Sequence, residues 1–320
     1  MQIFRDFSLL PQNLKGSIYA IGNFDGLHLG HRSVIEKARK ISIDNNVSLG
    51  VLTFDPHPRE YFRSDDPSFR LTPRKIKLSI LEKWNVDFVM NIPFDKKLSE
   101  TEASYFISKY LLKQLSIGGV VVGHDFAFGK NRKGDISMLK HASKENNFEL
   151  FVVKPQLSKS GSLYSSRSIR ELIQSGRPEE AAKFLGRWWS IKGDVIKGDQ
   201  RGRVLGYPTA NIKLGEYIQP SLGIYAVWVN INGLDSWYKG AASLGVRPTF
   251  DGVGVLLEVY LLDFNGDLYG KELEVAFVKY LRPEEKFLDI ESLKKQMAID
   301  CKKSNELLSK IDFSMEYFDK

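Results

Sequence analysis

The spacing of apolar residues changes once along the chain, close to Gly186. Before this point, short apolar runs alternate with segments in which apolar residues recur every three or four positions. This pattern predicts strands separated by helices, and therefore a parallel sheet covered on both faces. After it, short apolar runs separated by glycine-bearing turns predict a compact antiparallel barrel. We therefore expect two domains, residues 1–186 and residues 187–320.

The first domain is expected to contain five buried strands, at residues 18–21, 49–54, 86–92, 117–122 and 149–153. Ligands of such a sheet bind at the carboxyl ends of its strands. The helices between the strands are expected to begin at recognisable caps. The caps are Thr72 ahead of Pro73, a Ser99–Glu102 capping box, and Ser165 or Ser166 in a helix that Gly176 ends. A further short helix is expected at residues 178–185.

The second domain is expected to contain strands at residues 190–196, 223–229, 237–244, 255–262 and 272–278. Helical spacing returns only near the end of the chain. It predicts a closing helix whose apolar positions are Leu293, Met297, Leu307 and Ile311.

The composition, 42% hydrophobic and 27% charged over 320 residues, is ordinary for a globular protein. The single cysteine, Cys301, excludes an internal disulfide and fits a reducing compartment. The first ten residues lack a basic segment followed by an apolar one, and no apolar run is long enough to span a bilayer. We expect a cytoplasmic protein that does not associate with membranes.

The net charge is +7, and an excess of positive charge is typical of proteins that bind nucleic acids. The basic residues are dispersed, however, and anionic small ligands explain the excess equally well. We expect no nucleic-acid partner.

The turn at residues 19–32 carries the first candidate chemistry. His28 and His31 lie where the expected helix begins, so free N–H groups and the helix dipole attract phosphate there. Gly30 between them lets a ligand approach the backbone. Two other interpretations remain open: a metal site that includes Asp25, and histidines satisfied inside a core. The glycines of this turn match neither the Rossmann nor the P-loop spacing.

Two further segments of the first domain favour phosphate or a flat ring. After the strand that ends near Gly123 come Asp125, Phe126 and Phe128, followed by three cations at Lys130, Arg132 and Lys133. This set suits an aromatic ring with phosphates, although a solvated basic loop has the same composition. The helix start at Ser165 and Ser166, with Arg170 one turn later, again favours phosphate.

The second domain contains no histidine, so proton transfer there requires a carboxylate, Lys, Tyr or water. Its glycine-rich stretch fits either a phosphate cover or a plain hairpin. The residues concerned are Gly193, Gly198, Gly202 and Gly206, with Lys197, Arg201 and Arg203 as counter-charges. Thr209 and Asn211 offer the hard oxygen ligands that suit Mg²⁺. Glu258 interrupts an apolar strand, and is either an outward-facing residue or a functional carboxylate.

Four motifs of the first domain resemble those of bacterial bifunctional riboflavin kinase/FAD synthetases. They are G-N-F-D-G-L-H-L-G-H (22–31), T-F-D-P-H-P (53–58), G-H-D-F-A-F-G (123–129) and S-S-R-S-I-R (165–170). The first is similar to the H-x-G-H signature of nucleotidyltransferases. Arg167 departs from the family, which has threonine at that position.

The second domain is similar to the riboflavin kinase module, whose hallmark is G-x-P-T-A-N. The matching segments are G-Y-P-T-A-N (206–211), S-L-G-V-R-P-T-F (243–250), L-E-V-Y-L-L-D-F (257–264), D-L-Y-G-K-E-L (267–273) and Y-L-R-P-E-E-K-F (280–287). The resemblance implies a Rossmann-like nucleotidyltransferase domain followed by a mainly antiparallel β-barrel kinase domain with a C-terminal helix.

The resemblance also implies the site residues. His28 and His31 would stabilise charge during adenylyl transfer, and Glu258 would be the base for riboflavin. ATP and its phosphates would contact Asn23, Gly30, Ser165, Ser166, Arg170, Gly193, Lys197, Gly198 and Gly206. Flavin would contact Asp125, Phe126, Phe128 and Arg282, and Mg²⁺ would be held by Thr209 and Asn211.

The implied function is ATP-dependent conversion of riboflavin to FMN, followed by adenylylation of FMN to FAD with release of pyrophosphate. Arg167 is expected to contribute to ATP binding, and the protein to be a monomer or a weak homo-oligomer. Two alternatives remain: a riboflavin kinase whose first domain only binds a ligand, and an H-x-G-H protein that acts on RNA, for which strong salt-dependent RNA affinity would be the sign.

Overall fold

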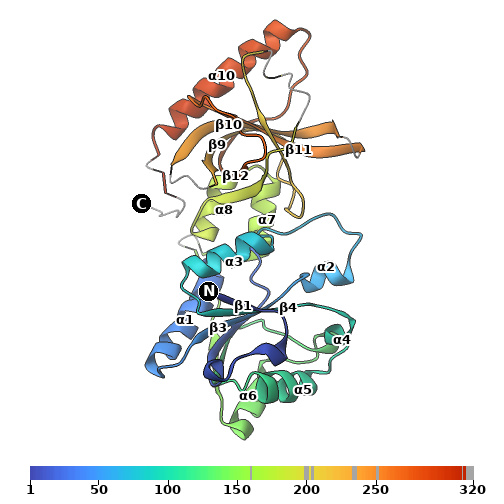
Figure 1. Ribbon diagram of the computed structural model, residues 1–320, viewed down its shortest axis with the longest axis vertical. Helices are drawn as coiled ribbons and strands as arrows, with labels where there is room; N and C mark the ends of the chain where they lie inside the picture. Colours follow the sequence, from blue (N-terminus) through green and yellow to red (C-terminus); the bar gives the residue numbers. More distant parts are fainter. Residues whose placement is uncertain are drawn as a thin grey trace. The chain divides into compact units, whose positions relative to one another are not determined.

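The computed structural model describes residues 1–158, 161–197, 202, 205–232, 236–249, 252–311 and 313–314. Its internal contacts divide the chain into two compact units (Figure 1). Unit 1 comprises Met1–Pro67 and Thr72–Tyr164, and unit 2 comprises Ser68–Leu71 and Ser165–Lys320. By these contacts residues 165–186 group with unit 2, and the domain boundary after Gly186 stays a prediction.

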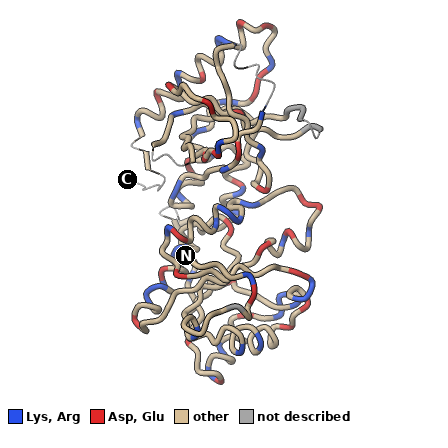
Figure 2. Tube along the Cα trace, in the orientation of Figure 1, with Lys and Arg blue, Asp and Glu red and all other residues tan. Residues whose placement is uncertain are grey.

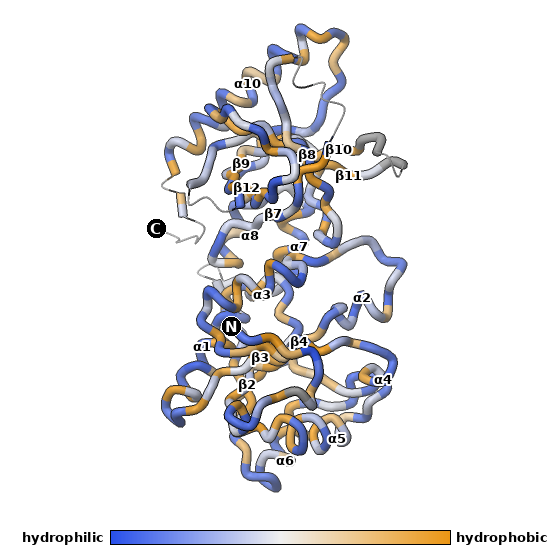
Figure 3. The backbone as a smooth tube through the Cα atoms, in the orientation of Figure 1, coloured by the Kyte–Doolittle hydropathy of each residue, from blue (hydrophilic) through white to orange (hydrophobic). Residues whose placement is uncertain are grey.

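Unit 1 is built on a six-stranded parallel sheet with the strand order β1-β4-β3-β2-β5-β6. The strands are β1 (Gln2–Phe4), β2 (Ile18–Ile21), β3 (Leu49–Phe54), β4 (Phe88–Ile92), β5 (Gly119–Gly123) and β6 (Glu149–Val153). This confirms the expected parallel sheet and the five expected strands. β2, β3, β4 and β5 are buried and strongly apolar, whereas the edge strand β6 is only partly buried (Figure 3). The strand β1 was not predicted; it has three residues and is mostly exposed.

The helices of unit 1 lie between these strands in sequence. They are α1 (Leu29–Asp44), α2 (Pro58–Phe62), α3 (Arg74–Lys83), α4 (Lys96–Ser99), α5 (Ala103–Tyr105), a π-helix η3 (Phe106–Gln114) and α6 (Ile136–Asn146). Short 3-10 helices lie at Phe7–Leu9, Gln12–Leu14 and Lys130–Arg132.

Two predicted helix caps are wrong. The N-cap of α3 is Pro73, because Thr72 uses its hydroxyl elsewhere, to accept a hydrogen bond from the N–H of Gly26 at 2.9 Å. The Ser99–Glu102 capping box does not form either. Ser99 is the last residue of α4, and its Oγ donates to the Lys96 carbonyl at 2.8 Å.

Unit 2 contains a six-stranded antiparallel sheet with the order β7-β12-β9-β10-β11-β8. The strands are β7 (Trp189–Asp194), β8 (Ala210–Lys213), β9 (Gly223–Ile231), β10 (Trp237–Thr249), β11 (Gly252–Leu261) and β12 (Glu272–Arg282). An isolated antiparallel bridge between Ile196 and Asn211 joins the two edges of this sheet, so it curls into the expected barrel. β8 was not predicted as a strand.

The barrel is accompanied by α7 (Ser166–Gln174), α8 (Pro178–Leu185) and α10 (Ile290–Leu308). Ser165 caps α7, as expected, by accepting a hydrogen bond from the N–H of Ser168 at 3.1 Å. The expected closing helix is confirmed as α10, on which Leu293, Met297 and Leu307 are half-buried. Its most buried positions are Asp300, Ser304 and Leu308, and Ile311 follows the end of the helix. Charged residues of both signs are interspersed along the trace of each unit (Figure 2).

Candidate active sites

The turn between β2 and α1 in unit 1 has an unusual backbone. Phe24 and Leu27 both have positive φ angles, 49° and 43°, although neither is glycine. Gly26 between them has φ of 87°. Side chains with a Cβ avoid this region, and such residues cluster at functional sites where the surrounding structure holds them. The turn leads directly into His28.

His28 and His31 lie together at the start of α1, as the sequence predicts. His28 is the N-cap, and its Nδ1 accepts a hydrogen bond from the N–H of His31 at 3.3 Å. Their rings are stacked with centroids 3.7 Å apart. A Cβ added at Gly30 would lie 3.0 Å from the His28 ring, so glycine leaves room for this stack.

The metal interpretation of the histidine pair finds no support. Asp25 is buried, and its Oδ1 accepts a hydrogen bond from the N–H of Thr72 at 3.0 Å. Within the part of the chain that the structure describes, no group of three or more His, Cys, Asp or Glu could hold a metal ion.

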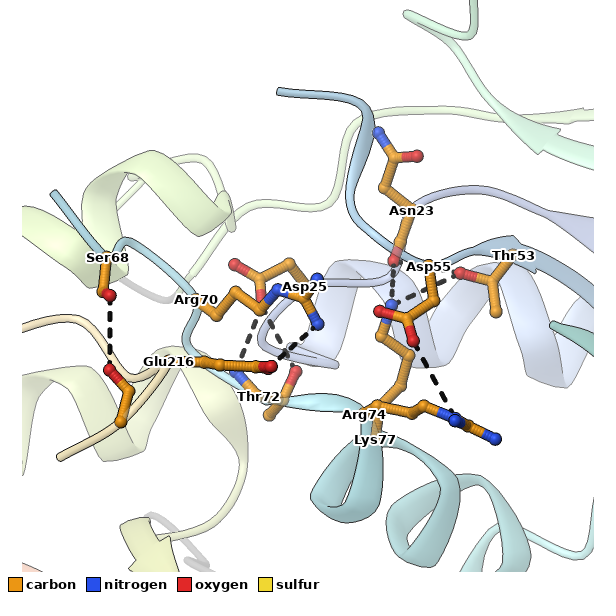
Figure 4. Close-up of polar contacts among 11 residues, drawn as sticks. Asn23, Asp25, Thr53, Asp55, Ser68, Arg70, Thr72, Arg74, Lys77 and Glu216 are labelled. Carbon is orange, nitrogen blue, oxygen red and sulfur yellow. Dashed lines mark hydrogen bonds and ion pairs between the residues drawn. The ribbon is translucent and has the colours of Figure 1, made fainter. Parts of the chain in front are cut away.

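Asn23 contributes to this turn through its backbone as well as its side chain. Its carbonyl accepts hydrogen bonds from Lys77 Nζ at 2.8 Å and from Thr53 Oγ1 at 3.2 Å. Its amide side chain is exposed and points away from these bonds in Figure 4. The side chain is therefore accessible, as the predicted nucleotide contact requires.

The predicted flavin-binding residues in the loop after β5 differ in solvent exposure. Asp125 is exposed, whereas Phe128 is 8% exposed and belongs to the core of unit 1. The rings of Phe126 and Phe128 are stacked with centroids 5.5 Å apart. Asp125 and Phe126 are thus accessible to a ligand, whereas Phe128 is buried and packs against the ring of Phe126.

Ser165, Ser166 and Arg170 belong to unit 2. Arg170 donates from Nε to the carbonyl of Phe69 at 2.9 Å and lies over the ring of that residue. Arg167 has an 88% exposed side chain and pairs with Glu171 at 3.0 Å. The phosphate contacts expected of these residues stay predictions.

In unit 2, three polar residues form a row across neighbouring strands. Glu258 on β11 lies directly opposite Asn211 on β8 and directly opposite Ser243 on β10. Residues in such positions project from the same face with Cβ atoms about 4.5–5.5 Å apart. Leu257 and Val259 are fully buried on the other face. The sheet therefore brings together the predicted base and one predicted metal ligand.

The side-chain oxygen of Asn211 is in a state that suits its predicted role as a metal ligand. Asn211 is 7% exposed, and its Oδ1 has no hydrogen-bond partner among the residues that the structure describes. A buried amide oxygen is costly unless something binds it. Thr209, the second predicted ligand, is partly buried just before β8.

Only some residues of the glycine-rich stretch predicted to cover phosphates in unit 2 lie within the described part of the chain. A Cβ at Gly193 would lie 2.7 Å from Cγ2 of Ile212, so glycine here lets β7 and β8 approach. Gly206 has φ of 87° in open space, and Lys197 is exposed. Gly198, Arg201 and Arg203 lie outside the described residues.

Arg282, a predicted flavin contact, has a protein partner. Its Nη2 lies 2.7 Å from Oδ2 of Asp300, and Nε contacts both oxygens of that carboxylate. These hydrogen bonds raise the pKa of the Arg282 guanidinium above its ordinary value. Asp300 was not predicted as a site residue; its signal in the sequence is a charged residue within the closing helix. Thr53, Thr72 and Lys77, which contact the turn between β2 and α1, were not predicted for the site either.

The two units define two classes of enzyme. A parallel α/β unit with stacked histidines at a helix start is a nucleotidyltransferase fold, and an antiparallel barrel with a Glu–Asn row suits phosphoryl transfer. Residues 10–167 match the family model of FAD synthetase, and residues 185–308 match that of riboflavin kinase.

Relatives with the same description share most of their length with this chain. Each is a bifunctional riboflavin kinase/FMN adenylyltransferase. That of Haemophilus influenzae is 37% identical over 94% of this chain and 97% of its own length. That of Listeria monocytogenes is 38% identical over 92% and 93%, respectively. The chain belongs to the bifunctional riboflavin kinase/FMN adenylyltransferase family.

A solved structure shares the fold along the whole chain. It is the crystal structure of a macrolide-efflux protein from Streptococcus pneumoniae, 28% identical, with a TM-score of 0.84 over 98% of this chain and 99% of that one. In the part of this chain that the structure describes, every helix is too short or too polar to cross a membrane.

Proposed function

We propose that the chain carries two active sites and that the residues described above perform the chemistry. The chain is a riboflavin kinase and FMN adenylyltransferase: it phosphorylates riboflavin with ATP to FMN, and adenylylates FMN with a second ATP to FAD. The observation that carries the kinase assignment is the register that sets Glu258 opposite Asn211.

In the kinase reaction, Glu258 accepts the proton of the riboflavin 5′-hydroxyl. The hydroxyl oxygen then bonds to the γ-phosphorus of ATP while the bond to ADP breaks. Asn211 and Thr209 would hold Mg²⁺, which the unpartnered buried oxygen of Asn211 fits. The metal neutralises phosphate charge when bound. Glycines 193, 198 and 206 and Lys197 would surround the phosphates, and positioning supplies most of the rate.

In the adenylyl transfer, a phosphate oxygen of FMN bonds to the α-phosphorus of ATP while the bond to pyrophosphate breaks. His28 and His31 donate hydrogen bonds to the phosphate oxygens, with Gly30 leaving room for their approach. Fixed donors that face charge developing in a transition state lower its energy. The exposed amide of Asn23 is a further proposed contact with ATP. The phosphate contacts of Ser165, Ser166 and Arg170, which belong to unit 2, stay predictions from the sequence.

The remaining assignments also stay proposals. Asp125, Phe126 and Phe128 would contact the flavin of FMN. Arg282 would contact riboflavin through whatever part of its guanidinium Asp300 leaves accessible. A cytoplasmic location and the absence of nucleic-acid and membrane partners are inferred from the sequence, and a monomer or weak homo-oligomer stays a prediction.

One experiment separates the candidate functions. Pure protein is incubated with riboflavin, ATP and Mg²⁺, and the flavins are separated by chromatography. FMN and FAD together are the expected products. FMN alone would mean that the first unit binds ligands without catalysis. Neither flavin, combined with strong salt-dependent RNA binding, would favour the RNA-directed alternative.

A further inference from the structure

A lysine lies among the buried residues of α3. Lys77 is 5% exposed and shares the inward face of its helix with Ile76, Ile80 and Leu81. Lysine is rarely buried unless its ammonium group is held by specific partners, because desolvating the charge is costly. The side chain therefore has a local role that an apolar residue at this position would not fulfil.

The ammonium group of Lys77 is directed at the turn that precedes the histidines. Its Nζ donates to the carbonyl of Asn23 at 2.8 Å and lies 3.4 Å from Oγ1 of Thr53. Thr53 is fully buried near the carboxyl end of β3 and donates to the same carbonyl. Figure 4 shows the two side chains converging on this one oxygen. The carbonyl of Asn23 is thus fixed from two directions.

A second anchor holds the same turn two residues further on. The hydroxyl of Thr72 accepts from the N–H of Gly26 at 2.9 Å, and the backbone N–H of Thr72 donates to Asp25 Oδ1 at 3.0 Å (Figure 4). Thr72 and Asp25 are 1% and 4% exposed. The hydrogen bonds are therefore shielded from water, where they are stronger than at a surface.

The two anchors lie next to the strained part of the backbone: Phe24 lies between Asn23 and Gly26, and Leu27 follows Gly26 directly. Phe24 and Leu27 have positive φ angles, a conformation that persists only where the surroundings over-determine it. His28 follows at once, as the cap of α1. The direction in which both histidine rings project consequently depends on the path of residues 22–28.

We propose that Lys77 and Thr72 are positioning residues for adenylyl transfer: they hold the turn at residues 22–28 in the shape that directs Asn23, His28 and His31 at the substrate phosphates. Neither touches substrate. This inference rests on the proposed function of the histidines. It goes beyond that function by assigning the shape of the turn to Lys77 of α3 and to Thr72 just before α3, neither of which belongs to the four motifs of the first domain.

The test compares Lys77→Met and Thr72→Val with Lys83→Met, a control in which an exposed lysine of the same helix is changed. FAD synthesis from FMN is measured with purified full-length protein. We expect kcat/KM to fall by roughly tenfold to a hundredfold in the first two variants, the scale of loss for misplaced catalytic groups. The control should match the wild type. Lys77→Arg, which keeps a charged donor, should recover part of the rate.

A double-mutant cycle with His28→Ala separates positioning from general destabilisation. If Lys77 acts through the turn, Lys77→Met should lower the rate of the His28→Ala variant far less than that of the wild type. Equal fractional losses in both backgrounds, or rates of Lys77→Met and Thr72→Val within threefold of the wild type, overturn the inference. Thr72→Val is nearly isosteric, so it decides the question if Lys77→Met does not fold.

The proposed function fails separately from the inference. A His28→Ala variant with undiminished FAD synthesis would remove the histidines from the reaction. Loss of activity in His28→Ala, with full activity in both Lys77→Met and Thr72→Val, would overturn the positioning role alone.

Discussion

Asn211 and Glu258 lie directly opposite each other on the antiparallel strands β8 and β11. They are 47 positions apart in the sequence, yet the register places their side chains on one face of the sheet. An amide oxygen for a cation and a carboxylate for a proton are thereby brought to one place. Phosphoryl transfer from ATP to a hydroxyl needs both.

The first prediction concerns the base. Glu258→Gln keeps the shape of the side chain but cannot accept a proton, so FMN formation should fall by about a hundredfold or more, as expected for loss of a general base. Conversion of FMN to FAD should persist. Both rates are measured separately, with the exposed Glu306→Gln as control. A kinase rate within a few-fold of wild type removes Glu258 from this role.

The second prediction separates activity from stability at Asn211. Leucine has a similar volume and removes a buried oxygen that lacks a partner among the described residues. Asn211→Leu should therefore raise the ligand-free unfolding free energy by about 1 kcal/mol. Kinase activity should become far less responsive to Mg²⁺. Urea unfolding and Mg²⁺ titration test the two halves, and an unchanged Mg²⁺ requirement would exclude Asn211 as a ligand.

The third prediction separates the observed role of His28, the N-cap of α1, from its proposed role in phosphate binding. His28→Ala should lose about 1 kcal/mol of stability with the cap, whereas His28→Asn should retain most of it. FAD synthesis should fall by roughly a hundredfold in both, because neither residue replaces the imidazole donor. Thermal unfolding and flavin assays provide the comparison. Full activity of His28→Asn would show that His28 only caps α1 and takes no part in the reaction.

The fourth prediction concerns Arg167, which is exposed and forms an ion pair with Glu171. Exposed ion pairs contribute little to stability. Arg167→Thr should change stability by less than about 0.5 kcal/mol, as for other exposed pairs one helical turn apart. If Arg167 contributes to ATP binding, the KM for ATP in FAD synthesis should rise.

Glu171→Gln is the matched control for this substitution. It removes the partner and leaves the arginine, so the KM for ATP should stay the same, and riboflavin kinase constants should be unaffected in both variants. A wild type that makes no FAD, together with FAD synthesis by Arg167→Thr, would instead identify Arg167 as a lesion in the first unit.

The fifth prediction concerns pH. Burial, with a smaller effect of Asp300, raises the pKa of the Cys301 thiol from 9.0 to about 11. The folded thiol therefore retains its proton where the unfolded one loses it, so this group lowers stability as pH rises from 9 to 11. Iodoacetamide should label the folded protein far more slowly at pH 8 than the urea-unfolded chain, since the thiolate is the reactive form.

Mass spectrometry of the labelled protein measures both rates, and labelling of the folded protein should accelerate steadily toward pH 11. Cys301→Ser should remove the labelling and the alkaline loss of stability attributed to this group. Equal labelling of folded and unfolded chains at pH 8 would show that the thiol is not shielded.

Most of the secondary structure could be predicted from local patterns. The five expected strands of unit 1 and helix α8 were located within two residues, because strongly apolar runs and the residues that end them are neighbours in the sequence. The strands β1 and β8 could not be predicted. β1 has only three residues and is mostly exposed, and β8, A-N-I-K, contains two polar residues. Their existence depends on a neighbouring strand supplied from elsewhere in the chain.

The residues of the candidate sites could likewise be named from the sequence, whereas their contacts with one another could not. His28, His31, Asn211 and Glu258 could be named as candidates from their residue types and neighbours in the sequence. The fold was needed to show that Glu258 lies opposite Asn211 and that Asp300 pairs with Arg282. It also showed that Thr72 binds Gly26 instead of capping α3. Each of these contacts joins residues far apart in the sequence, so it is set by strand register and helix packing, which local periodicity does not encode.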